Sequence, residues 1–154
     1  MKLSAKGEYA VMAILELALS GGHRPIQVKA IARKQGIPVR FLEQVMSSLK
    51  RAGLVESIRG AQGGYVLAKA PAEIRLGDLL QAIDGPLPSA DGTTDRDRRG
   101  YGEKEDLGAE QGLIKELWAE VNVSLEGVLN AINFEELCER KRKKDRQRIL
   151  MYHI

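Results

Sequence analysis

Four polar residues at helical spacing could form specific hydrogen bonds with a flat polar partner: Arg40, Glu43, Gln44 and Ser47. At about 100° per residue they share one side of a helix, and the apolar residues between them fall on the opposite side. An arginine fork matches guanine, a glutamine amide matches adenine, and a glutamate accepts from the amino group of cytosine. The spacing predicts a helix that reads base edges, although by itself such a face is more often ordinary solvated surface.

A second candidate is a glycine-rich turn that begins at Arg59 and Gly60. The flanking segments, 54–58 and 65–68, are rich in β-formers, which predicts a hairpin with residues 59–64 at its tip. An arginine there suits a narrow minor groove, where negative potential is concentrated, and glycines let the backbone approach phosphates. Alone, such a segment is usually just a hairpin.

Three short helices are predicted ahead of this hairpin. The first begins at Ser4, a capping residue, and stops before residues 21–22, which are both glycine. The second covers 27–35 and ends at Gly36, and the third opens at Pro38 and ends at Gly53. Three helices and a hairpin predict a winged helix-turn-helix.

Residues 71–86 add a short strand at Ile74 and a small helix with Leu79, Leu80 and Ile83 facing inward. The DNA-binding domain is therefore predicted to span 1–86. The fold class is mainly α, with a small β-hairpin wing and a long C-terminal dimerisation helix.

The charge distribution separates the two halves of the 154-residue chain, whose net charge is +3. Residues 1–70 hold 11 Lys and Arg against 4 Asp and Glu, and the remainder has a net charge of −4. A basic half is typical of a polyanion partner such as double-stranded DNA. Cations expected at phosphates rather than bases are Lys2, Lys6, Lys50 and Arg51.

The second half divides into three segments. Residues 87–112 contain few large apolar side chains and predict a flexible, effector-type loop. The helix predicted over 113–133 has an apolar heptad stripe, typical of a dimer core: Ile114, Trp118, Val121, Leu125, Val128 and Ile132. Residues 134–154 predict a short helix and a basic tail, which is either a second phosphate-binding arm or a solvated end.

Four motifs in this order resemble the Rrf2 (Rrf-two) family of bacterial transcription regulators: residues 1–10, 41–45, 53–55 and 59–67. The resemblance implies a homodimer that binds a partly palindromic operator and acts mainly as a repressor. It places Arg40, Glu43 and Gln44 on the base-reading face, and Arg59 and Gly60 on the wing that enters the minor groove. Many members have a small polar residue where this chain has Arg40, so the operator sequence is not implied.

This chain differs from the cluster-binding members of the family in the segment that binds their sensor. Cluster-binding members hold an iron–sulfur cluster with three cysteines in the segment matching 88–112, where this chain has none. Its one cysteine, Cys138, lies later, so we expect no cofactor and no metal site. The signal is then a small molecule, a partner protein, or oxidation of Cys138 if the neighbouring basic run lowers its pKa.

The sequence gives little support for an enzyme or a membrane protein. No catalytic triad, phosphate-binding loop or dinucleotide fingerprint is visible, so we expect no enzyme. No apolar run is long enough to span a membrane, and the N-terminus does not resemble a signal peptide, which favours a cytoplasmic protein. The alternative function is a winged-helix protein-interaction adaptor without specific DNA reading.

Overall fold

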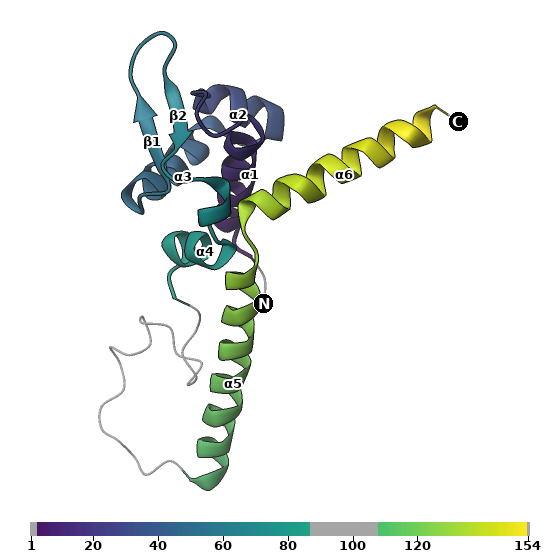
Figure 1. The fold of residues 1–154 in the computed structure, drawn as a ribbon. Helices are drawn as coiled ribbons and strands as arrows, with labels where there is room; N and C mark the ends of the chain where they lie inside the picture. Colours follow the sequence, from purple (N-terminus) through teal and green to yellow (C-terminus); the bar gives the residue numbers. More distant parts are fainter. Residues whose placement is uncertain (1–2, 87–107, 154) are drawn as a thin grey trace.

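A computed structural model describes residues 3–86 and 108–153. Four helices and a hairpin form a globular part, and two long helices leave it in different directions (Figure 1). The elements in chain order are α1 Ala5–Leu19, α2 Val28–Gln35, α3 Val39–Arg51, β1 Val55–Ile58, β2 Gly64–Leu67, the 3-10 turn η1 Pro71–Glu73, α4 Leu76–Asp84, α5 Ala109–Ala131 and α6 Phe134–Tyr152.

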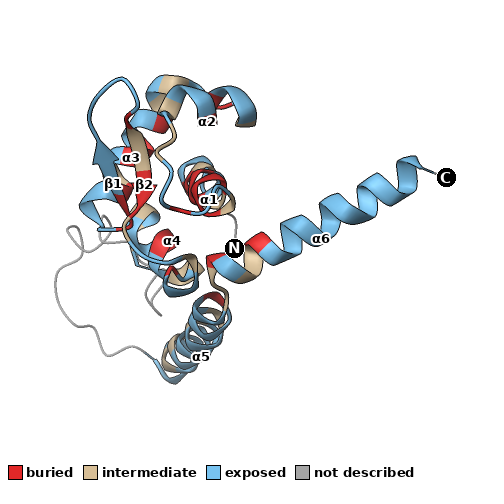
Figure 2. Ribbon diagram, turned by 45° about the horizontal axis from the view of Figure 1, so that its top comes forward, coloured by how far each residue is buried: buried red, intermediate tan, exposed pale blue. Residues whose placement is uncertain are grey.

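Helix α1 is the centre of the core (Figure 2). Its residues Ala10, Ala13, Ile14 and Leu17 are fully buried, and α3, α4 and the start of α6 all pack on it. Small alanines on one stripe allow several elements to approach the same helix closely. This helix therefore fixes where α3 and α6 lie relative to each other.

The predicted helix ends of residues 1–86 are confirmed. The Ser4 hydroxyl accepts a hydrogen bond from the Gly7 amide at 2.9 Å, which caps α1. Gly36 ends α2 with a left-handed φ of 65°, and its freedom there produces the sharp turn into α3. Strands β1 and β2 pair antiparallel, from Val55 opposite Leu67 to Ile58 opposite Gly64.

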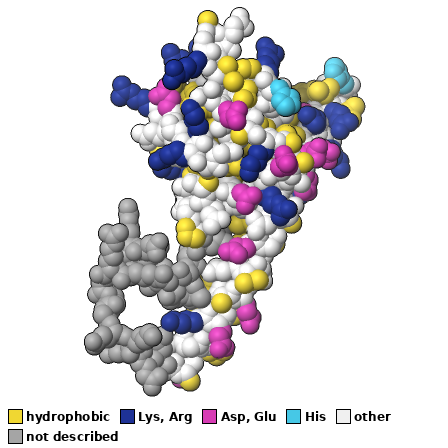
Figure 3. All heavy atoms as spheres, turned by 60° about the vertical axis from the view of Figure 1, so that its left-hand side comes forward, with side chains coloured by type: hydrophobic (Ala, Val, Ile, Leu, Met, Phe, Trp, Pro, Cys, Tyr) yellow, Lys and Arg dark blue, Asp and Glu magenta, His cyan; other side chains and the backbone are white. Residues whose placement is uncertain are grey.

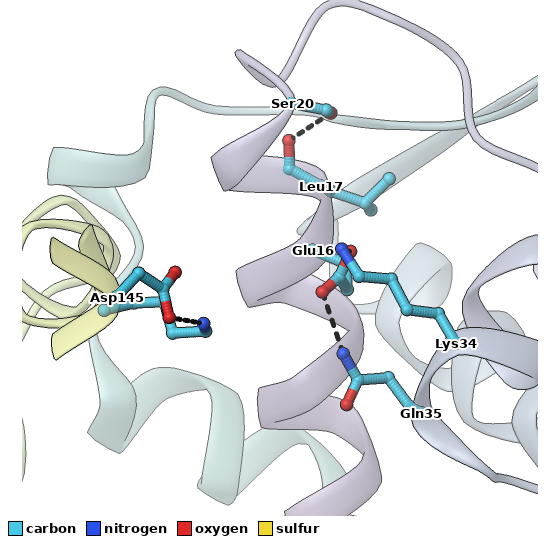
Figure 4. A network of polar contacts seen from close by, with 7 residues as sticks. Glu16, Leu17, Ser20, Lys34, Gln35 and Asp145 are labelled. Carbon is cyan, nitrogen blue, oxygen red and sulfur yellow. Dashed lines mark hydrogen bonds and ion pairs between the residues drawn. The ribbon is translucent and has the colours of Figure 1, made fainter. Parts of the chain in front are cut away.

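A buried carboxylate fixes α2 against α1 (Figure 4). Glu16 accepts hydrogen bonds from Lys34 Nζ at 2.7 Å and from Gln35 Nε2 at 2.8 Å. A buried carboxylate requires such partners, because its desolvation would otherwise be costly. These contacts hold the end of α2, and with it the turn that leads into α3.

The predicted strand at Ile74 is wrong. The region instead makes a one-residue bridge between Arg75 and Asn133. The Leu76 amide donates to the Ile132 carbonyl at 2.9 Å, and the Phe134 amide donates to the Ile74 carbonyl at 3.1 Å. These bonds attach the junction between α5 and α6 to the segment that leads into α4.

The second half also differs from prediction. Helix α5 begins at Ala109, so the end of the predicted loop is helical, while residues 87–107 lie outside the described part. Helix α6 is not a short helix with a tail: it continues through the basic run to Tyr152. Ion pairs one turn apart, Arg140 with Glu136 and Lys141 with Asp145, stabilise it. None of the helices in the described ranges is long and apolar enough to cross a bilayer.

Candidate nucleic-acid interface

Helix α3 presents a polar face to solvent because its other face is anchored in the core. Its residues Leu42, Val45, Met46 and Leu49 are buried. The predicted reading residues are exposed on the opposite side of the same helix: Arg40, Glu43, Gln44 and Ser47. Among the described residues, none of these four side chains takes part in a hydrogen bond or an ion pair. Their donors and acceptors are free for an external partner.

The hairpin tip is shaped by glycines. Gly60 has a φ of 113°, and its carbonyl accepts from the Gly63 amide at 3.0 Å, which closes the turn. A Cβ at Gly63 would lie 2.1 Å from the Ile58 carbonyl oxygen, so no other residue fits there. Arg59 is exposed at the beginning of this tip and is also without an intrachain partner in the described ranges.

The end of β2 next to the hairpin turn is held by a pairing that no sequence pattern predicted. Ile26 and Tyr65 form a bridge with two backbone hydrogen bonds, of 3.0 and 2.8 Å. A Cβ at Gly64 would lie 2.5 Å from the Ile26 backbone, so the glycine permits this close approach. The bridge fixes the wing relative to the segment that enters α2.

Two of the four predicted phosphate contacts, Lys50 and Arg51, lie in the last turn of α3. Lys50 Nζ donates to Ser57 Oγ at 2.6 Å and so links α3 to β1, and Arg51 donates to Ser48 at 3.3 Å. Lys6 is exposed on the first turn of α1, and Lys2 lies outside the described residues. Lysine and arginine side chains gather on this half of the molecule (Figure 3). Lys50 and Arg51 therefore place positive charge at the C-terminal end of α3.

The apolar stripe of α5 divides into two parts. Ile114, Trp118, Val121 and Val128 are exposed, so no part of the described chain covers them. Leu125 is half-buried against the core, and the buried residue of α5 is Leu129. Ile132, which follows the helix as its C-cap, is half-buried. In the lower part of Figure 3, apolar and acidic side chains are visible on the surface of the molecule. A large exposed apolar face is typical of an interface.

Cys138 is enclosed in the core, with 3% of its surface exposed. Burial raises the pKa of its thiol, and the nearby charge of Arg142 acts in the opposite direction without offsetting it. A reactive cysteine requires an exposed thiol with a lowered pKa. The structure therefore contradicts the idea that the basic run activates Cys138 as a redox sensor.

Comparison with known proteins shows which family and which solved structures this chain is similar to. Residues 3–140 match the family model Rrf2, described as an iron-dependent transcriptional regulator. The chain is 36% identical to the HTH-type transcriptional regulator CymR of Bacillus subtilis, over 90% of each protein. It is 37% identical to the regulator IscR of Pectobacterium carotovorum, over 94% of this chain and 84% of that protein.

Solved structures agree. The structure of the Bacillus subtilis global cysteine regulator CymR matches with a TM-score of 0.72 and 34% identity, covering 91% of this chain and 98% of the other. IscR of T. potens matches with a TM-score of 0.70 and 34% identity, covering 92% and 88%. The predicted winged helix-turn-helix fold with a C-terminal helix is confirmed.

Proposed function

Because this chain belongs to the Rrf2 family and is a DNA-binding transcription regulator, we propose that it acts as a repressor, working as a homodimer on a partly palindromic operator. The observation that carries the proposal is the outer face of α3, where Arg40, Glu43, Gln44 and Ser47 are exposed and unpartnered among the described residues. Side chains held on a rigid helix can read bases precisely, because the core fixes their orientation.

Each residue has a separate role in this proposal. Arg40 addresses guanine, Gln44 adenine and Glu43 the amino group of cytosine, with Ser47 adjacent to them in the major groove. Arg59 enters the minor groove, and Gly60 brings the wing backbone close to it. The phosphates are contacted by Lys2, Lys6, Lys50 and Arg51, which position the protein without reading sequence.

A gel-shift titration with genomic fragments tests the function. A repressor retards a few fragments at low concentration, whereas the protein-interaction adaptor would retard all fragments weakly and alike. The adaptor has less support, since the family match covers the helices and wing of the DNA-binding domain together.

On the operator so identified, we expect Gln44→Ala to lower affinity by about 1–3 kcal/mol and to relax the preference at one base position of each half-site. Arg59→Ala weakens binding through the minor groove, most strongly on operators with a narrow, A·T-rich segment under the wing. The measurement is a titration against a panel of single-base operator variants at fixed salt.

Arg75→Ala is the control for these substitutions, since Arg75 is exposed but belongs to neither α3 nor the wing. It is expected to leave affinity and base preference unchanged. If Gln44→Ala retained the full base preference of the wild type, the assignment of α3 as the reading helix would be wrong.

We further propose that the chain holds no iron–sulfur cluster of its own. Such a cluster needs thiolates, and the chain has one cysteine, which is buried in the core on α6. In the described ranges no three His, Cys, Asp or Glu side chains are grouped as metal ligands would be. The residues present therefore do not fit a cluster, and the proposed signal is a small molecule or a partner protein.

The test of this second proposal is anaerobic purification followed by an absorption spectrum and metal analysis. We expect a colourless protein without stoichiometric iron. An absorption band in the visible region together with bound iron and sulfide would contradict it. A Cys138→Ala variant is the matched control, because loss of such a band in that variant would identify the thiol as a ligand.

A further inference from the structure

The C-terminal half of α6 extends beyond the region that the family model matches. The family match ends at residue 140, while the helix continues to Tyr152. At 1.5 Å per residue, these twelve residues add about 18 Å of helix. All of them are exposed, and the helix projects away from the globular part in two views (Figures 1 and 2).

This extension carries an excess of positive charge. Residues 140–148 include seven Lys and Arg and one Asp. Arg140 pairs with Glu136, and Lys141 pairs with Asp145. The other cations have no acidic partner among the described residues: Arg142, Lys143, Lys144, Arg146 and Arg148.

The placement of these five cations destabilises the helix in isolation. Arg142 and Arg146 are one turn apart, as are Lys144 and Arg148, and like charges at this spacing repel each other. At about 100° per residue the five side chains cover roughly two thirds of the helix circumference, and Lys141 and Asp145 lie on the remaining side. Residues 140–148 therefore have no apolar face to bury against a protein. A polyanion that neutralises several of them removes the repulsion without burying any side of the helix.

We propose that α6 beyond residue 140 is a second DNA-binding element, which contacts phosphates of the duplex next to the operator. The inference rests on the proposed function and extends it, since DNA is the polyanion that the regulator already binds. In Figure 1, α6 and α5 leave their junction in different directions, and the far end of α6 lies beyond the globular part with no other element beside it. Phosphate contacts of this kind add affinity but no sequence preference.

The experiment compares two duplexes, the operator alone and the operator with about ten further base pairs on each side. Wild-type protein is compared with a variant in which the five unpaired cations are changed to glutamine, a good helix former. We expect the wild-type protein to bind the long duplex about tenfold more tightly than the short one. The variant is expected to bind both duplexes with similar affinity. Its slope of log K against log salt on the long duplex falls by about 0.9 for each phosphate that the variant no longer neutralises.

Two further variants make the result specific. Arg140→Gln with Lys141→Gln removes cations that are already paired, and it is expected to retain most of the gain from the flanks. A chain ending after Arg140 removes the whole extension, and it should behave like the five-residue variant. Circular dichroism of each variant with and without long duplex follows the expected increase in helix content on binding.

The outcomes separate this inference from the proposed function. If the five-residue variant gains as much from the flanks as the wild type, the inference is overturned. If it sediments as a monomer while the wild type is a dimer, α6 contacts the partner subunit, which also overturns it. If the wild type shows no base preference at all, the proposed function fails, and weaker binding of the variant to nonspecific duplex still supports the role of α6.

Discussion

Replacing Trp118 with Glu and Val121 with Asp is expected to convert the proposed homodimer to a monomer and to lower operator affinity by about 100-fold or more. The two side chains are 51% and 42% exposed in the single chain, and they lie about one turn apart on the part of the heptad stripe that the core does not cover. In a dimer they would be enclosed, and burying two unpaired carboxylates there costs several kcal/mol. A monomer contacts one half-site, so it loses the gain that comes from linking two binding domains.

Sedimentation analysis and a titration on the full operator measure the two effects together. The matched control is Val123→Asp, which places a charge on the opposite side of the same helix at a residue that is 70% exposed. It is expected to leave both the dimer and the affinity intact. A double variant that remains a dimer at micromolar concentration would show that the interface lies elsewhere.

The second large effect is expected at Phe134, the first residue of α6. Phe134→Ala should lower the free energy of unfolding by about 3–5 kcal/mol, because the ring is fully buried and its removal leaves a cavity. For a chain of this length the melting temperature should fall by about 6–20 °C. The ring packs where α6 meets the rest of the core, so α6 is expected to detach before α1–α3 unfold.

Thermal unfolding followed by circular dichroism measures this loss. Met151→Ala is the control, since it truncates a large apolar side chain of the same helix that is exposed, and we expect a change within about 0.5 kcal/mol. Similar destabilisation by both substitutions would mean that the far end of α6 is also packed in the folded protein.

The first 86 residues could be predicted well because their signals are local. Ser4 and Gly36 mark helix ends through their own chemistry, and the apolar side of α3 follows directly from helical spacing. The pairing of Ile26 with Tyr65 has no such signature: the partners are far apart in sequence and each has an ordinary local context. For the same reason, the β-former Ile74 suggested a strand, although its neighbour Arg75 pairs with one residue only.

The second half of the chain was harder to predict, because composition and periodicity do not show which surface a helix packs against. The heptad stripe predicted one apolar face for α5, but Leu125 and Leu129 lie against the core of the same chain. The basic run at 140–148 has the composition of a tail, yet α6 continues through it because Phe134 and Cys138 anchor its first turns. Which bases and phosphates the α3 and wing residues contact stays a prediction from the sequence and the exposed geometry.

The bridge between Arg75 and Asn133 holds the C-terminal end of α5, while the N-terminal end of the helix lies far from this attachment. Backbone hydrogen bonds on both sides of the bridge fix the pivot, while the beginning of the helix is about 34 Å away at 1.5 Å per residue. A rotation of about 10° at this pivot displaces the distant end by about 6 Å, close to the rise of two base pairs. In the proposed homodimer, a small change in how the two α5 helices cross would therefore alter the separation of the two α3 helices, and with it the spacing of half-sites that the dimer fits.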